Sequence, residues 1–172
     1  MFKKNRGQNL VELVIVLPLL VLLILGIIQF GLYWRTFQTV ESVALEGASV
    51  ASSTVDSIKT TNNEAKDAAV LAINERLKMA GLPQIDPASI AAVNGTEPYA
   101  LYQSAAVVNP NDVQVTIDYR NPSANGIVVQ VVFGYQPILA GTQIPIPGRD
   151  PISIIPDFVE VSSSQIQQYN TY

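Results

Sequence analysis

The sequence predicts an α+β protein: a long N-terminal transmembrane helix that continues into an extracytoplasmic helix, then a second helix and a small antiparallel sheet. The apolar run over residues 10–34 is about 25 residues long, enough at about 1.5 Å per residue to cross a hydrocarbon core of about 30 Å. Apolar residues at helical spacing continue to about residue 53 and recur over residues 64–80. Beyond Pro83 the pattern changes to alternation between turn residues, which is typical of strands.

The composition argues against several classes of function. The chain of 172 residues contains no Cys and no His, so it lacks disulfides, thiolate metal ligands and the usual general base. Its formal net charge is −4 and its cations are scattered after the span, so we expect no nucleic-acid partner. Four aspartates were candidates for a calcium or acid-pair site, but their spacing matches no ligand loop: Asp112, Asp118, Asp150 and Asp157. We therefore expect that the protein is not an enzyme and that it has no catalytic residue, cofactor or metal site.

Charge asymmetry predicts the orientation of the span. Three cations lie within the first six residues, whereas Arg35 alone follows the apolar run closely, so we expect a cytoplasmic N-terminus and a translocated domain over residues 36–172. An ordinary secretory signal has an apolar region of about 7–15 residues and a small-residue cleavage site. This run is longer and ends at Tyr33 and Trp34, which are typical of an interfacial anchor. We therefore expect a single-pass membrane protein.

The residues in front of the span carry a second signal. The chain begins MFKKNRG and continues QNLVELVIVLPLL, which places Glu12 five residues after Gly7 and Pro18 six residues after Glu12. This arrangement resembles the processing site of type IV pilin-like proteins. The fuller pattern GQxLVELxIVLP resembles the TadE-like pseudopilins of the tight-adherence (Flp) pilus machinery. The resemblance is specific over residues 6–18 and looser to about Ala51.

The resemblance implies that a prepilin peptidase cuts between Gly7 and Gln8 and leaves Glu12 at position five of the mature chain. It also implies that Glu12 marks the substrate and neutralises the new amino terminus of a neighbouring pilin or pseudopilin subunit. The expected location is the cytoplasmic membrane of a prokaryote, with incorporation into an extracellular pilus. The expected parts of the chain are a basic leader at 1–7, a transmembrane helix at 8–35 and an extracytoplasmic pilin-like domain at 36–172.

Two alternatives stay open from the residues alone. Glu12 could simply lie near the membrane interface, where a carboxylate in the first helical turns reaches water and favours the positive end of the helix dipole. The protein could also be an unprocessed single-pass anchor whose extracytoplasmic domain binds a partner. The mature N-terminus distinguishes this anchor from a pilin-like subunit.

The first helix is expected to run from near Asn9 to about Ser53. Pro18 removes a backbone donor within the span and predicts a bend there. Gly26 and Gly31 would allow close approach of another helix, although glycine is also simply tolerated in membrane helices. Small residues in the upper half should pack tightly against another helix: Ala44, Gly47, Ala48 and Ala51.

The second helix is expected to begin with a capping box at Thr61–Glu64 and to end at Gly81 and Pro83. Residues 96–111 should be irregular, and the proline-rich residues 137–156 cannot form a central strand throughout. The polar tail SSSQIQQYNTY should be loose. Strands are expected over Ala88–Val93, Val113–Tyr119, Ile127–Tyr135 and Phe158–Ser163, with the second and third forming a hairpin.

Overall fold

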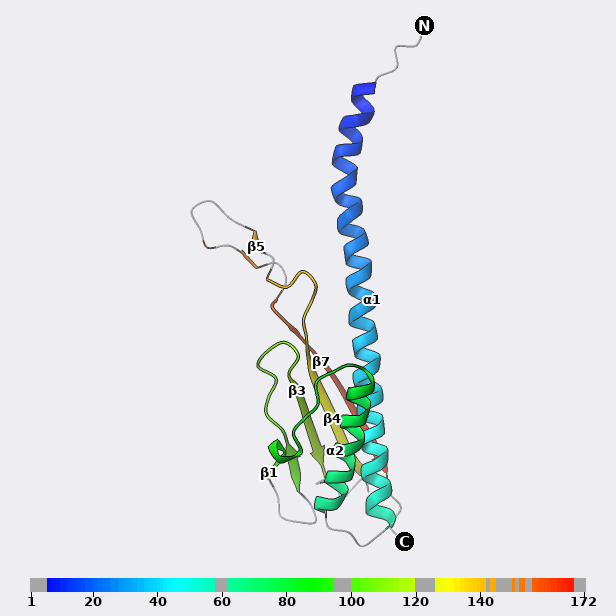
Figure 1. Ribbon diagram of the computed structural model, residues 1–172, viewed down its shortest axis with the longest axis vertical. Coiled ribbons are helices and arrows are strands. Elements are labelled where there is room, and N and C mark those ends of the chain that lie inside the picture. The colour runs from blue at the N-terminus through cyan, green and yellow to red at the C-terminus, as the bar shows by residue number, and fades with distance from the viewer. Residues whose placement is uncertain are drawn as a thin grey trace. The chain divides into compact units, whose positions relative to one another are not determined.

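The computed structural model describes residues 6–57, 62–94, 100–119, 126–141, 143–144, 150, 152–153 and 156–168. The chain divides into two compact units, Met1–Arg35 and Thr36–Tyr172, which we call unit 1 and unit 2. The described part of unit 1 is helical throughout. Unit 2 contains the rest of that helix, a second helix and the sheet (Figure 1). The predicted α+β class is confirmed.

The first helix, α1, spans Arg6–Ser57, so it starts before Asn9 and passes the predicted end at Ser53. Two hydroxyls near its C-terminal end bond to the helix itself. The hydroxyl of Ser53 donates to the Val50 carbonyl at 3.0 Å, and that of Thr54 donates to the same oxygen at 2.8 Å. Among the polar residues after Ser53, Thr54 therefore has its hydroxyl bonded within the helix, which continues to Ser57. Pro18 lies inside α1, and the bend expected there stays a prediction.

The second helix, α2, spans Asn62–Met79. Gly81 follows it with a φ of 72°, a left-handed conformation that glycine adopts without steric cost. The amide of Gly81 donates to the Lys78 carbonyl and the amide of Leu82 donates to the Leu77 carbonyl, which together form a Schellman motif. The predicted C-terminal end is confirmed within two residues, whereas Thr61 of the predicted capping box lies outside the described residues.

A five-stranded antiparallel sheet forms the other layer of unit 2, in the order β1-β2-β3-β4-β7. Its strands are β1 (Ala91–Asn94), β2 (Leu101–Gln103), β3 (Val113–Asp118), β4 (Gly126–Tyr135) and β7 (Val159–Gln168). A short 3-10 helix, η1 (Pro87–Ser89), precedes β1, and β5 (Gln143–Ile144) pairs with β6 (Ile152–Ser153) as a separate two-stranded sheet. The predicted hairpin is confirmed as β3 and β4, which pair from Val113↔Phe133 to Asp118↔Val128.

Three expectations for the strands were wrong. The region expected to be irregular contains β2, whose Tyr102 pairs with Ile117; three residues are too few to show a period in the sequence. The first predicted strand begins as η1, because the Asp86 carboxylate accepts the Ala88 amide and closes a turn there. The tail expected to be loose is β7 as far as Gln168, since ladder bonds to β4 use the backbone and tolerate polar side chains.

The core of unit 2 lies between the helices and one face of the sheet (Figure 1). A Cβ placed on Gly47 of α1 would lie 2.7 Å from Ile73 Cδ1 of α2 and 3.3 Å from Val129 Cγ1 of β4, so three elements meet at this glycine. The largest fully buried side chains of this core are Val40, Val43, Val70, Ile73, Leu77, Val115, Ile117, Ile127, Val129, Val131 and Val161.

Candidate functional site

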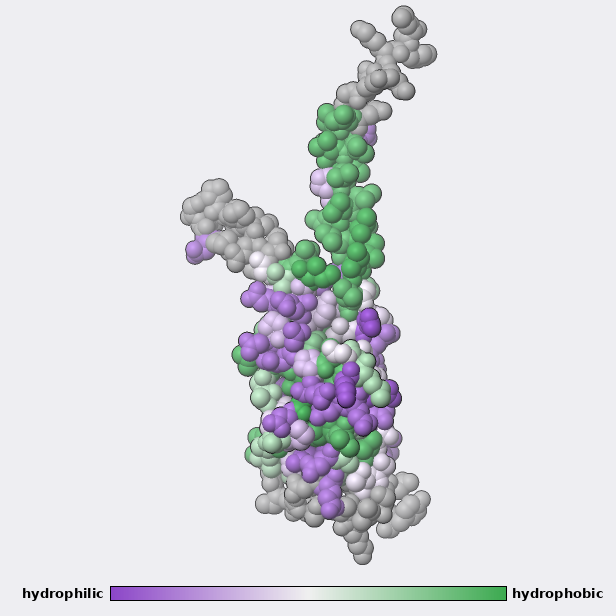
Figure 2. Space-filling view, viewed as in Figure 1, coloured by the Kyte–Doolittle hydropathy of each residue, from purple (hydrophilic) through white to green (hydrophobic). Residues whose placement is uncertain are grey.

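The N-terminal part of α1 exposes an almost uninterrupted apolar surface. Figure 2 shows this surface as hydrophobic over nearly all of the visible face of the helix in unit 1. Leu19 is 71 % exposed, Leu22 71 % and Phe30 66 %, so nothing within the described chain covers them. Among the described residues, α1 is the one helix that is long and apolar enough to cross a membrane, and its candidate span is Leu10–Thr54. A helix that is apolar on all sides and uncovered fits a single-pass membrane protein.

The predicted processing residues lie at the start of this helix. Because α1 begins at Arg6, both Gly7 and Gln8 belong to its first turn. That turn contains a cation and no acidic residue, which is unfavourable at the positive end of the helix dipole. Glycine also weakens a helix by about 1 kcal/mol relative to alanine. The bond between Gly7 and Gln8 lies in the first turn of α1, and the exposed Glu12 follows in the next turn.

Within unit 1 the glycines and aromatic residues of the span have different surroundings. A Cβ on Gly26 or Gly31 would meet no atom within 4 Å. The rings of Phe30 and Trp34 stack with centroids 6.3 Å apart at the end of the apolar segment, where an aromatic pair suits a membrane interface. Space beside the glycines allows another helix to approach closely.

The small residues of the upper half of α1 lie in unit 2 and face its own core. Ala44, Ala48 and Ala51 are fully buried, and Gly47 contacts side chains of α2 and β4. Helical spacing predicts which face of a helix is buried, but it does not say which helix covers that face. Within the described structure, the side chains that lie against Gly47 belong to α2 and β4 of the same chain.

Replacing Gly47 with alanine is expected to destabilise unit 2 by about 1–3 kcal/mol, because the new methyl group would overpack the contact with Ile73. Gly26→Ala is the matched control, since it makes the same change in the same helix where nothing lies within 4 Å. Chemical unfolding of both full-length variants in detergent measures the difference. Equal stability of the two variants would contradict the assignment of Gly47 to a close-packed contact.

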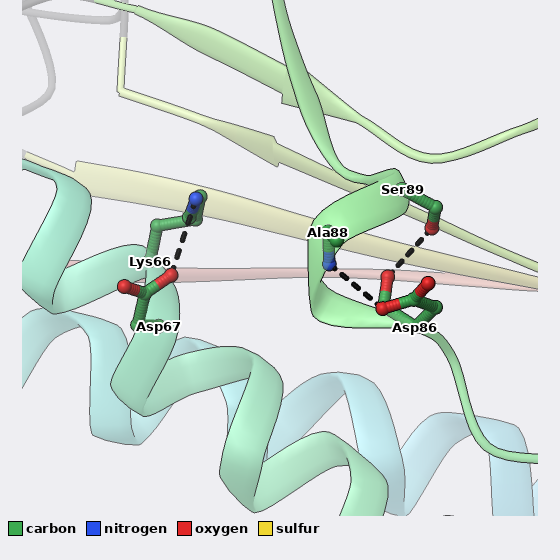
Figure 3. Close-up of polar contacts among 5 residues, drawn as sticks. All are labelled: Lys66, Asp67, Asp86, Ala88 and Ser89. Carbon is green, nitrogen blue, oxygen red and sulfur yellow. Dashed lines mark hydrogen bonds and ion pairs between the residues drawn. The ribbon is translucent and has the colours of Figure 1, made fainter.

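Polar contacts in unit 2 serve mainly to close turns. Figure 3 shows Asp86, whose carboxylate accepts the Ala88 amide at 3.0 Å, while its carbonyl accepts the Ser89 hydroxyl at 2.6 Å. Nearby on α2, Lys66 and Asp67 form an ion pair of 3.1 Å. These bonds satisfy backbone groups and neighbouring charges, which is a structural role rather than a catalytic one.

A cavity of about 280 Å³ lies between the chain before β1 and the loop before β3. Its lining includes Asp86, Ser104 and Asp112. The amides of Asn109 and Val108 donate to the Asp112 carboxylate, and these bonds hold its pKa below the usual value. Within the described ranges, no group of three or more His, Cys, Asp or Glu side chains is placed to hold a metal ion.

Two tyrosines of unit 2, Tyr102 and Tyr119, are buried side by side. The rings of Tyr102 and Tyr119 meet edge to face with centroids 5.9 Å apart, and Lys66 Nζ lies 5.5 Å from the Tyr102 centroid. Burial raises the pKa of Tyr119, with smaller contributions from Tyr102 and Asp67. The tyrosine therefore stays neutral, and its ring serves to fill the core.

Comparison with known proteins gives a match at the N-terminus. Residues 7–49 match the family model described as TadE-like protein. No curated protein and no solved structure matches the chain. The matched residues run from Gly7 through Glu12 and Pro18 to the small residues that pack on α2, so they include most of α1. This match is consistent with membership of the TadE-like family, whose proteins are structural components of pili. The chain carries a TadE-like domain at residues 7–49.

Proposed function

We propose that the protein is a pilin-like (pseudopilin) subunit of a tight-adherence type IV pilus assembly, processed after Gly7 by a prepilin peptidase. The observation that carries this proposal is the exposed apolar helix headed by Gly7, Gln8 and Glu12, inside the stretch that matches TadE-like proteins. Such a helix can exist in two apolar environments, a lipid bilayer and a bundle of similar helices. A subunit that moves from the first to the second needs no catalytic group.

Removal of the leader prepares the helix for this transfer. Hydrolysis between Gly7 and Gln8 removes Lys3, Lys4 and Arg6 and exposes a new amino group at the start of the helix. A charge in hydrocarbon is expensive unless it is paired, and attraction between opposite charges is stronger where the dielectric constant is low. The Glu12 carboxylate of one subunit is therefore a favourable partner for the Gln8 amine of its neighbour.

Packing through the helix completes the assembly. Between helices in lipid the driving forces are van der Waals contact and hydrogen bonding, because lipid tails are as apolar as the side chains. Gly26 and Gly31 have open space beside them and would let a second helix approach closely. The excess of cations before the span supports an orientation with the N-terminus in the cytoplasm and unit 2 outside. The subunit is thus presented to the pilus assembly from the membrane.

Photo-crosslinking in the native host tests this role. A photoreactive residue in place of Ile27, which is 65 % exposed in the span, should form adducts with pilin or pseudopilin subunits. Leu71 of α2 is 64 % exposed and provides a matched control outside the span, where we expect no such adduct. If the probe at Ile27 labels lipid alone, the protein is an ordinary membrane anchor and the proposal is wrong.

A further inference from the structure

The outer side of β7 is the open edge of the main sheet. On its inner side β7 pairs with β4 over ten residues, from Tyr135↔Val159 to Gly126↔Gln168, with one constant register and no bulge. Within the described part of the chain, no strand pairs with its other side. An unpaired strand presents a row of amide and carbonyl groups that can bind another extended chain.

The two edges of this sheet differ in how they are protected. The edge strand β1 has four residues, and its register shifts between Ala92 and Asn94, which shortens and bends that edge. β7 has ten residues, VEVSSSQIQQ, without proline, lysine or arginine. Short length, bulges, prolines and lysines are the usual devices that prevent sheet edges from pairing. β7 has none of these four, and Glu160 is the one charged side chain along it.

The side chains of β7 that face away from the helices indicate which side chains a strand paired with β7 would carry. This outer row begins with one charge, Glu160, and its one large apolar group is Ile166, which is 60 % exposed and is followed in the row by Gln168. Ser162 and Ser164 lie between them and are exposed. A strand running antiparallel to β7 would fit best with an apolar residue opposite Ile166 and a cation six residues later, opposite Glu160.

The β7 edge of a second copy in the same membrane cannot supply this antiparallel strand. Within unit 2, α1 and β7 run in the same direction (Figure 1). Antiparallel pairing of two β7 edges needs a two-fold axis perpendicular to the sheet, which would reverse α1 in one copy. Copies anchored from the same side keep α1 in one direction, a step that rests on the proposed membrane anchoring. The opposite edge of such a copy, β1, is too short to cover β7.

We infer that β7 is a docking edge for an extended strand of a different polypeptide, which adds to the sheet antiparallel to β7. The backbone bonds of the added strand supply the affinity. Its apolar residue opposite Ile166 and its cation opposite Glu160 set the register. This contact lies in unit 2, so it is additional to packing through the membrane helix.

A photoreactive strand peptide tests the docking edge. The probe is Ile-Thr-Ser-Thr-Ser-Thr-Lys with capped ends and a diazirine label, added to the full chain held as single copies in lipid nanodiscs. We expect saturable adducts that mass spectrometry maps to β7. The double variant Ser162→Lys and Ser164→Lys places two charges along the edge. It should reduce the adduct yield at least about tenfold. Gln130→Lys is the matched control, because Gln130 is exposed on the same face one strand inward, paired with Ser164.

Three outcomes would overturn the inference. The first is the absence of saturable adducts, and the second is an adduct yield that the two lysines leave unchanged. The third is protection of the β7 amides from hydrogen exchange on both sides before any probe is added, which would show that the edge is already covered. Normal leader processing together with any of these outcomes would leave the proposed function standing and remove this inference alone.

Discussion

Exchanging Glu12 for alanine is expected to prevent incorporation of the protein into pilus assemblies while its insertion into the membrane continues. The change leaves the Gln8 amine of a neighbouring subunit without a partner in an apolar environment. Breaking a buried ion pair by removing one partner typically costs about 3–5 kcal/mol, which lowers an assembly equilibrium more than a hundredfold. Quantifying the protein in sheared surface filaments against the membrane fraction measures this loss.

The same helix offers a control for this prediction. Glu41 is an exposed glutamate of α1 in unit 2, so Glu41→Ala removes the same group outside the apolar segment. We expect Glu41→Ala to be incorporated as well as the unmodified protein. If Glu12→Ala is also incorporated normally, the proposed pairing of Glu12 with the Gln8 amine is refuted. Glu12 would then simply lie at the membrane interface, in contact with water.

Exchanging Gly7 for phenylalanine is expected to block removal of the leader almost completely, without affecting membrane insertion. In the proposed function, the absence of a side chain at Gly7 leaves room for the peptidase to approach the bond to Gln8. Phenylalanine favours the helix by several tenths of a kcal/mol relative to glycine and adds a bulky ring beside that bond. Intact mass of the purified variant should show a chain that still carries residues 1–7.

A second glycine provides the control for processing. Gly26→Phe introduces the same ring in the same helix, where no atom lies within 4 Å of the new Cβ. We expect this variant to lose its leader normally, whatever happens to its later assembly. Efficient processing of Gly7→Phe would mean that the peptidase does not read this glycine, and cleavage would have to be sought elsewhere in the chain.

Much of the fold could be predicted because the strongest patterns are long. The apolar run before Arg35 and the alternation of Val113–Asp118 show their periods over enough residues to be recognised. β2 has three residues, and it forms a strand because it pairs with β3, more than ten residues further along the chain. A local sequence pattern does not reveal such a pairing. The sequence predicts a strand over Phe158–Ser163, and the polar residues that follow are typical of a loose tail, yet β7 pairs with β4 as far as Gln168. Its open edge was missed for the same reason, and the weak alternation of Val159 and Val161 was the available signal.

The candidate site could be predicted as a motif but only partly as a surface. The positions of Gly7, Glu12 and Pro18 can be read from the sequence, because short-range spacing alone defines them. The packing partner of Gly47 could not be read in this way. Its contact with Ile73 depends on how α2 returns along α1, which periodicity does not encode. In the structure, the helix beside Gly47 is α2 of the same chain.

The mature N-terminus of the protein in its native host tests the central claim most directly. Intact mass measurement of the protein extracted from membranes and filaments identifies the first residue without any mutation. We predict a chain that begins at Gln8. A steady-state chain that still begins at Met1 would contradict processing by a prepilin peptidase and would favour a permanent membrane anchor.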